Sequence, residues 1–411
     1  MSTSVASQFT IAAATGGVTA AEGFTAAGLH CGIKAKAGAL DLSLLAADTA
    51  VPAAGLFTTN LAQAAPVTVS KQHLEASQGV VRAVVVNSGC ANACTGSVGM
   101  TDARRMAAET AAQLGCQPEQ VLVASTGVIG VNLKMDKLVP GIRAAAAALG
   151  REHGSVMARA IMTTDPFPKE HAVAVKTPRG TFTVGGTGKG SGMIEPNMAT
   201  MLGFLATDAR VSPAVLRRAL KESADATFNA ITVDGECSTN DCVFAMASGA
   251  SGVEIDDEFY PALVAGFYEV SRQLAMGIVR GGEGATKLIT IAVKDARTAA
   301  DAMRVAKTIA NSPLVKTAVH GADPNWGRIV AASGRAGVMF DVDRATVHVG
   351  GILLFENGLP HDGNAPKAAE HLKQKDVSID VHLGTGGGGD ATVWTCDLSA
   401  EYVKINGEYR T

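Results

Sequence analysis

Residues 185–202 read GGTGKGSGMIEPNMATML, and this run is the sharpest landmark within the chain. Glycine lets the backbone adopt conformations that a β-carbon forbids, and it lets other groups approach closely. Such freedom suits a strained or cleavable bond, although a glycine-rich stretch taken alone more often predicts a flexible surface loop. A phosphate-binding loop around Lys189 would need Gly at 183 and Ser or Thr at 190. The chain has Thr183 and Gly190, so that pattern fails at both positions.

Strands and helices are predicted on both sides of this landmark. Short β-branched runs that end in polar turns predict strands, and apolar residues at helical spacing predict amphipathic helices. Ser212 and Pro213 supply an N-cap and a first-turn proline, which predicts a helix from there to about Phe228. The other predicted elements are strands at 80–86, 121–124, 288–293, 346–354, 377–383 and 391–398 and helices at 101–114, 137–149, 257–276 and 299–310. This alternation predicts an α/β or α+β fold.

The composition predicts a globular protein of two or three domains. Of the 411 residues, 47% are hydrophobic, 18% charged and only 4% aromatic, which fits a core built mainly from small aliphatic side chains. The formal net charge is −3 and no basic stripe is present, so we expect no nucleic-acid partner. No apolar run reaches the ~18 residues of a membrane span. We therefore expect no membrane association either.

Cysteine and histidine spacing gives no sign of a metal centre. The seven cysteines include no CxxC pair, and the nine histidines include no HxH or HxxxH pair. Residues 1–33 contain no Lys or Arg, so they lack the charged start of a signal peptide and the Arg-rich pattern of a transit peptide. We expect reduced thiols, a cytoplasmic location and no metal.

The run from Gly192 to Leu202 closely resembles the self-cleavage segment of the ornithine acetyltransferase family of arginine biosynthesis. Six further segments carry the same resemblance in the same order, and several are polar, so core packing does not explain them. They are NSGCANACTG at 87–96, STGVIG at 125–130, MTTD at 162–165, DGECSTND at 234–241, HGADPNWGR at 320–328 and NGEYRT at 406–411. The resemblance spans essentially the whole chain.

The resemblance implies both a fold and a processing event. The implied fold is α/β (α+β), with layered sheets between helices, as in self-cleaving enzymes of the N-terminal-nucleophile type. Cleavage before Thr200 would give an α chain of residues 1–199 and a β chain of residues 200–411. The two are expected to stay together because they fold as one unit, and two of each are expected to form a heterotetramer.

Thr200 is the predicted nucleophile. A threonine hydroxyl is a weak nucleophile and needs an adjacent base. If Thr200 attacks the carbonyl of Ala199, the chain shifts from amide to ester, and water then releases an α-amine whose pKa is roughly 8 in free peptides. That amine can take the hydroxyl proton near neutral pH. Without the resemblance, Thr200 would be read as the start of a helix over residues 201–205.

The resemblance assigns further residues to the site. Thr126 and Gly127 are expected to form the oxyanion hole, which supplies donors to the developing O⁻ of the acetyl carbonyl. Lys189 and Glu283 offer a cation for a substrate carboxylate and an anion for an ammonium group. The implied substrate contacts are Thr163, Lys189, Thr200, Glu283, Asn406 and Thr411. Without the resemblance, Thr126 and Gly127 would be interpreted as a turn at the end of a strand. Lys189 and Glu283 would be interpreted as solvated charges, and Asn406 and Thr411 as part of a frayed terminus.

The implied reaction is a ping-pong acetyl transfer. Thr200 would take acetyl from N-acetylornithine, ornithine would leave, and glutamate would attack the acetyl-threonine ester to give N-acetylglutamate. The cycle needs no cofactor. Some members of the family also acetylate glutamate from acetyl-CoA, so acetyl-CoA is a further candidate substrate.

Three other functions remain open from the residues. An N-terminal-nucleophile hydrolase such as an aminopeptidase would share the chemistry of Thr200 but pass the acyl group to water. A nucleotide-binding protein could use GTGGGGD at 384–390 as a phosphate nest. A non-catalytic interaction protein would remain uncut.

Four residues depart from the family pattern or leave their role open. Cys90 stands where Asn is expected, and Cys237 and Cys242 occupy positions that are often Thr or Ser. They are expected to be small buried residues or to alter local hydrogen bonding. His320 lies in a polar family segment, and we assign it no catalytic role.

Overall fold

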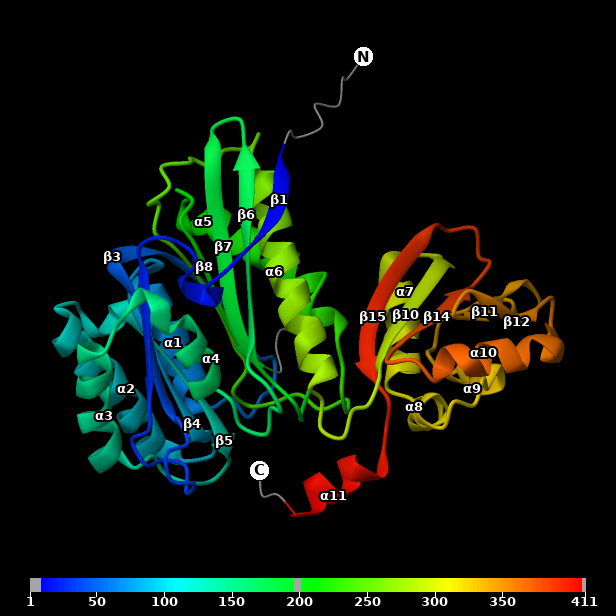
Figure 1. Ribbon diagram of the computed structural model, residues 1–411, viewed down its shortest axis with the longest axis horizontal. Coiled ribbons are helices and arrows are strands. Elements are labelled where there is room, and N and C mark those ends of the chain that lie inside the picture. Colours follow the sequence, from blue (N-terminus) through cyan, green and yellow to red (C-terminus); the bar gives the residue numbers. More distant parts are fainter. Residues whose placement is uncertain (1–8, 196–200, 409–411) are drawn as a thin grey trace.

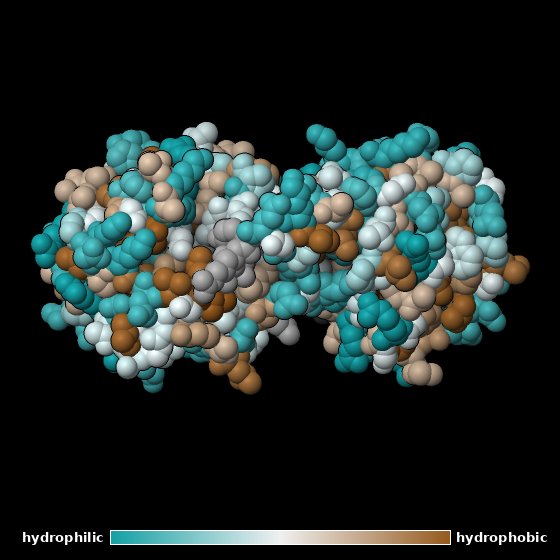
Figure 2. Space-filling model, turned by 90° about the horizontal axis from the view of Figure 1, so that it is seen from below, coloured by the Kyte–Doolittle hydropathy of each residue, from teal (hydrophilic) through white to brown (hydrophobic). Residues whose placement is uncertain are grey.

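The protein has two lobes, which lie side by side in the computed structural model (Figure 1). The structure describes residues 9–195 and 201–408. The first lobe ends near Gly281, after helix α6, and the second runs from Leu288 to Cys396. Helix α11 (Ala400–Glu408) leaves the second lobe and returns beneath the first (Figure 1). Seen from below, the lobes are two rounded masses with a waist between them, and apolar side chains are scattered among hydrophilic ones (Figure 2).

The first lobe is built on nine strands in the order β1-β6-β7-β8-β9-β3-β4-β5, with β2 paired to β3. The long strand β3 joins two packed sheets, because its first part pairs with β2 and β4 and its last part with β9. The strands are β1 (Thr10–Ala14), β2 (Phe24–Leu29), β3 (Leu42–Phe57), β4 (Val80–Cys90), β5 (Val121–Val128), β6 (Lys169–Thr177), β7 (Gly180–Lys189), β8 (Leu202–Thr207) and β9 (Cys242–Ala247).

Helices cover the outer faces of both sheets. They are α1 (Ala65–Ala76), α2 (Gly96–Leu114), α3 (Met135–Ala147), α4 (Gly154–Ala160), α5 (Pro213–Asp225) and α6 (Tyr260–Arg280), with 3-10 turns η1 (Gly17–Thr19), η2 (Pro118–Gln120), η3 (Arg151–His153) and η4 (Phe228–Ala230). Alternate residues of a strand point to opposite faces. In β4, Val84 and Val86 therefore point toward the sheet that contains β8 and β9, while Ala83 and Val85 pack against helices α2 and α3. The predicted arrangement of layered sheets between helices is confirmed.

The second lobe has a six-stranded sheet in the order β13-β12-β11-β14-β10-β15. Its strands are β10 (Leu288–Ala296), β11 (Thr346–Val349), β12 (Ile352–Glu356), β13 (Leu359–Pro360), β14 (Asp376–His382) and β15 (Gly389–Cys396). Its helices are α7 (Ala299–Ala310), α8 (Pro313–His320), α9 (Trp326–Gly334) and α10 (Ala365–Leu372), with 3-10 turns η5 (Val342–Arg344) and η6 (Asp362–Asn364). It has its own apolar core, to which β10 and α7 each contribute several buried side chains.

Most predicted elements are present, with shifted ends. The helix predicted at 299–310 is α7 residue for residue, and the Ser212 side chain caps α5 by accepting a hydrogen bond from Val215 N at 3.3 Å. The single strand predicted at 346–354 is wrong. It is two strands, β11 and β12, because Gly350 and Gly351 take up φ of 62° and 74° and turn the chain back.

The glycine-rich run is also not a surface loop over its first half. Residues 185–189 belong to β7, which pairs with β6 and β8. A β-carbon on Gly185 would lie 2.0 Å from the carbonyl oxygen of Gly17, and one on Gly186 would lie 2.6 Å from Leu205 Cδ2. These two glycines therefore allow close packing inside the lobe. The connection to β8 begins only at Gly190.

In the described part of the chain, every helix is too short or too polar to cross a lipid bilayer.

Candidate active site

One pocket lies where several strands of the first lobe end and where α11 returns. Strands β4 and β5 are parallel, so their carboxyl ends meet at one edge, and the paired ends of β7 and β8 reach the same place. Six sequence-predicted residues line this pocket: Thr126, Gly127, Thr163, Lys189, Glu283 and Asn406. Its other walls include Ala91, Ile129, Met193, Met201, Leu202, Asp234, Asn240, Asp241 and Tyr402.

Lys189 joins two of the predicted residues by hydrogen bonds. Its Nζ donates to Thr126 Oγ1 at 2.9 Å and to Thr163 Oγ1 at 3.2 Å. Both acceptors are neutral hydroxyls, so the positive charge of Lys189 remains available to an anion in the pocket. The three side chains come from β7, β5 and the segment after α4, which the fold brings together.

Near the end of β5, the Thr126-Gly127 pair requires glycine at its second position. Gly127 has φ of 125°, and a β-carbon there would lie 2.4 Å from the carbonyl carbon of Gly89 on β4. Asn240 fixes the two strand ends to each other, because its Nδ2 donates to Ser125 O at 2.9 Å and to Ala91 O at 2.5 Å. A close-packed strand end of this kind can hold a hydroxyl and a backbone N–H rigidly.

A buried carboxylate, Asp165, positions two edges of the pocket. Its Oδ2 accepts from Thr163 N at 3.0 Å, and its Oδ1 accepts from Gly190 N at 2.8 Å, next to Lys189. Lys169 Nζ lies 2.5 Å from the same Oδ1, and both side chains are almost fully buried. Burial raises the pKa of Asp165, but the charges of Lys169 and Lys189, together with the hydrogen bonds that the carboxylate accepts, outweigh burial and leave the pKa at about 2. The carboxylate is therefore charged at neutral pH.

Helix α11 closes the opposite side. Asn406 Nδ2 donates to Glu283 Oε2 at 2.9 Å, and Tyr402 OH donates to Asp234 Oδ2 at 3.2 Å. Burial and the neighbouring Asp234 charge raise the pKa of Tyr402, so it stays a phenol. Asp234 also accepts from the backbone N–H groups of Met193 and Ile194, at 2.7 Å each. The start of the predicted self-cleavage segment is thus held against the pocket wall.

Three predicted residues, Ala199, Thr200 and Thr411, lie outside the described residues. The described neighbours of the first two are anchored on both sides. Ile194 accepts a hydrogen bond from Val233 N at 2.7 Å, and Met201 accepts one from Cys242 N at 3.1 Å. Met201, which follows Thr200 in the sequence, lines the pocket.

The remaining polar motifs have internal partners. Gly386 N and Gly388 N of the glycine-rich turn donate to the two carboxylate oxygens of Asp295, at 3.1 and 3.2 Å. The protein's own carboxylate therefore occupies the site that a bound phosphate would need.

His320 lies outside the pocket lining, and its Nδ1 is 2.7 Å from Asp397 Oδ2. Within residues 9–195 and 201–408, no three His, Cys, Asp or Glu side chains are grouped so that they could hold a metal ion.

The unusual cysteines also have local explanations. Cys90 is buried, and its Sγ donates to Val131 O at 3.1 Å. A thiol is a weaker donor than the amide of the Asn expected at this position. Cys242 is buried in the core between the two sheets. Cys237 Sγ lies 3.5 Å from Thr58 Oγ1. Burial raises the pKa of Cys90 and of Cys242, which keeps both as thiols.

Sequence reasoning did not single out four residues that hold the site together, three of which line the pocket and one of which, Asp165, lies behind it. Asp165, Asp234 and Asn240 lie inside family-like segments, so the signal was present but was not assigned to individual side chains. Tyr402 lies outside those segments, and a tyrosine on a short exposed helix gives no local sign of a role.

A family model and curated relatives match this chain over nearly its whole length. A family model described as the ArgJ family matches residues 25–411. A relative from Symbiobacterium thermophilum, named arginine biosynthesis bifunctional protein ArgJ, is 50% identical over 402 residues, covering 96% of this chain and 99% of that protein. A protein of the same name from Dehalococcoides mccartyi is 48% identical over 404 residues, covering 96% and 98%. A crystal structure of ornithine acetyltransferase complexed with ornithine, from Mycobacterium tuberculosis, is 43% identical with a TM-score of 0.43, covering 46% of this chain and 100% of that chain.

Proposed function

The chain belongs to the ArgJ family, and on that premise we propose that it moves an acetyl group from N-acetylornithine to glutamate, with Thr200 as the acetyl carrier. It is an acyltransferase of arginine biosynthesis. The observation that supports the proposal most directly is the gathering of Thr126, Gly127, Lys189 and Glu283 around one pocket beside Met201.

The contact between Lys189 and Thr126 prepares the proposed oxyanion hole. Lysine has only N–H donors, so the Thr126 oxygen accepts from Lys189 and the Thr126 O–H is left to donate. In the proposed reaction it donates, together with Gly127 N–H, to the acetyl oxygen as negative charge develops there. Lys189 adds a nearby positive charge.

The transfer takes two steps. Thr200 Oγ attacks the acetyl carbon, the C–N bond to ornithine breaks, and the hydroxyl proton passes through the Thr200 α-amine to the departing amine. The α-amine of glutamate then attacks the ester, the C–O bond breaks, and the proton returns to Thr200. Thr163, Lys189, Glu283, Asn406 and Thr411 are the proposed contacts to the amino-acid groups of both substrates.

Thr200 gains its free α-amine by self-cleavage after Ala199, which divides the protein into chains 1–199 and 200–411. Support comes from the anchoring of residues on both sides of this segment, which leaves a short connection between two paired strands.

We propose that two copies of each chain assemble into a heterotetramer in the cytoplasm. The cycle uses no cofactor, and acetyl-CoA is included as an alternative acetyl donor.

The test combines intact mass with an acetyl-transfer assay on the wild type, on Thr200→Ala and on a matched control, Thr317→Ala, at an exposed threonine of α8. We expect two fragments that join at 199/200 in the wild type and control, and one uncut inactive chain in Thr200→Ala. A wild type that remains a single chain contradicts the proposal. Fast release of acetate from N-acetylornithine without glutamate would instead identify a hydrolase.

A further inference from the structure

Charged side chains hold the peptide bond between Met162 and Thr163 at both ends. Lys34 Nζ donates a hydrogen bond to the carbonyl oxygen of Met162 at 2.7 Å. Asp165 Oδ2 accepts a hydrogen bond from Thr163 N at 3.0 Å. A cation therefore lies at the negative end of this peptide dipole, and an anion lies at its positive end. Because charge-assisted hydrogen bonds are stronger than neutral ones, the segment that brings Thr163 into the pocket is held firmly.

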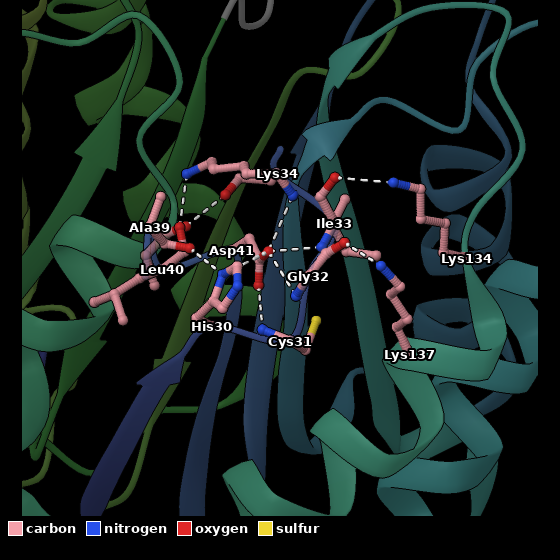
Figure 3. Close-up of polar contacts among 12 residues, drawn as sticks. His30, Cys31, Gly32, Ile33, Lys34, Ala39, Leu40, Asp41, Lys134 and Lys137 are labelled. Carbon is pink, nitrogen blue, oxygen red and sulfur yellow. Dashed lines mark hydrogen bonds and ion pairs between the residues drawn. The ribbon is translucent and has the colours of Figure 1, made fainter. Parts of the chain in front are cut away.

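Lys34 is itself held in place by a loop that is organised around one carboxylate, Asp41 (Figure 3). The buried carboxylate of Asp41 accepts hydrogen bonds from the backbone N–H groups of residues 31–34, at 2.6 to 3.0 Å. Lys34 Nζ also donates to the carbonyl oxygen of Leu40, at 2.7 Å. The backbone and the ammonium group of Lys34 are therefore both fixed by this loop.

The stem of Lys34 lies against the end of strand β4. A β-carbon on Gly89 would lie 2.9 Å from Lys34 Cγ, so glycine at this position leaves room for the stem. Gly89 in turn touches the proposed oxyanion hole, because a β-carbon on Gly127 would lie 2.7 Å from Gly89 Cα. Lys34 thus reaches from the strand ends that carry Gly127 to the segment that carries Thr163.

The charge of Lys34 interacts with groups in and behind the pocket wall. Burial has the largest effect on the pKa of Lys34 and lowers it. The charges of Asp41 and Asp165 raise this pKa and the charge of Lys189 lowers it, and the net shift of the pKa is downward. Lys189 Nζ also donates to Thr163 Oγ1 at 3.2 Å. A displacement of Thr163 would therefore change the surroundings of the cation that is proposed to bind the substrate carboxylate.

We propose that Lys34 is a positioning residue for substrate binding, which orients the peptide between residues 162 and 163 and, through it, the hydroxyl of Thr163. Thr163 lines the catalytic pocket, whereas Lys34 lies behind it. The inference rests on the proposed function, in which Thr163 contacts the amino-acid groups of both substrates. Loss of the ammonium group should therefore weaken the binding of both substrates and leave the chemical step at Thr200 nearly unchanged.

The test uses Lys34→Met in the full, matured enzyme, because methionine keeps an unbranched stem over Gly89 and removes the ammonium group. We expect the KM for N-acetylornithine and the KM for glutamate each to rise about tenfold, with kcat changed less than about twofold. The matched control is Lys137→Met. Lys137 is exposed on α3 and donates to the carbonyl oxygen of Gly32 in the same loop, at 3.2 Å (Figure 3). Both KM values should stay at the wild-type level in this control, and an equal rise there would overturn the proposal.

A double-mutant cycle with Thr163→Val tests whether Lys34 acts through Thr163. In the Thr163→Val background, Lys34→Met should raise the two KM values by less than about twofold, because the hydroxyl that it orients is gone. Additive effects would show that Lys34 acts independently of Thr163 and would overturn the proposal. Lys34→Arg keeps the charge and the donors, so its KM values should stay within about threefold of the wild type. An arginine variant as weak as Lys34→Met would place the effect in the stem and contradict the proposal.

Binding of ornithine, measured by calorimetry, separates this inference from the transfer reaction itself. We expect Lys34→Met to bind ornithine about tenfold more weakly than the wild type does. If the wild type transfers acetyl and the variant binds ornithine with wild-type affinity, the role of Lys34 is wrong and the proposed function stands. A wild type that neither transfers acetyl nor binds ornithine overturns both. A Lys34→Met chain that fails to fold or to cleave itself would show that Lys34 stabilises the fold as a whole, which also overturns the positioning role.

Discussion

Lys189 and Leu202 pair directly across strands β7 and β8, so residues 190–201 form a connection whose two ends are fixed side by side. A cut within this connection leaves every strand pair of the sheet in place. We therefore predict that the chains 1–199 and 200–411 remain associated after cleavage. Native mass spectrometry should give one complex and denaturing electrophoresis two chains. Fragments that separate in native buffer would contradict this.

Thr126→Val should slow acetyl transfer. The substitution keeps the size of the side chain but removes the hydroxyl that is proposed to stabilise the oxyanion, a loss that costs about 10²–10³ in rate. The comparison is kcat for acetyl transfer from N-acetylornithine, with Thr317→Val as the control at an exposed site. If Thr126→Val has the wild-type kcat, the hydroxyl of Thr126 does not stabilise the oxyanion.

Gly127→Ala should destabilise the protein far more than Gly130→Ala. Both glycines have positive φ, so each substitution carries the left-handed backbone cost of about 1–2 kcal/mol. Only at Gly127 does the new β-carbon also meet backbone atoms, at 2.4 Å, whereas nothing lies within 4 Å at Gly130. The midpoint of urea unfolding measures the difference. Equal midpoints would show that the β4 and β5 ends can separate at little cost.

Asp165→Asn should cost about 3–5 kcal/mol of unfolding free energy, because it leaves Lys169 buried without its partner. The pKa of Asp165 is about 2 in the folded protein, below its usual 3.8. The carboxylate therefore stabilises the folded protein fully only at pH values above 3.8. This contribution, about 2 kcal/mol, is lost as the pH falls from about 4 to about 2. The difference in unfolding free energy between the wild type and Asp165→Asn should therefore decrease as the pH falls over that range, as measured by urea unfolding at each pH. Asp256→Asn, at an exposed ion pair, should change little, and a large effect there would undermine the interpretation.

The cysteines should react with iodoacetamide in a fixed order. Cys94 is exposed, whereas Cys90 and Cys242 are buried and burial raises their pKa, so they hold little thiolate at pH 8. Peptide mass mapping should find Cys94 labelled first and the buried pair labelled only in urea. Labelling of Cys90 at the rate of Cys94 would mean that the β4 end opens in solution.

Local sequence patterns predicted elements where one pattern continued for several turns or strand residues. Helix α7 and strand β10 are examples, because helical spacing and β-branched content each persist there. Strand β3 was not predicted, although it is the longest. Its LSLLAADTAVPAAGLF sequence contains five Ala, one Pro and one Gly, which are poor strand formers, and it is largely buried on both faces, so it shows no alternation.

The site could be predicted only through the family resemblance. Lys189 and Thr126 are 63 residues apart, and Glu283 and Asn406 are 123 residues apart. No helix or strand period relates such positions, and each side chain alone fits a surface role. The buried pair of Asp165 and Lys169 was missed for a similar reason, since charges four residues apart are usually solvated.

The contact between Asn406 and Glu283 also has a consequence for the order of synthesis. A ribosome translates every strand of the first lobe, and the whole second lobe, before it reaches the codons of α11. The side chains of Tyr402 and Asn406 are therefore the last part of the pocket wall to be synthesised. A nonsense codon just before α11 would leave every strand of both lobes encoded but would remove the two side chains by which α11 lines the pocket.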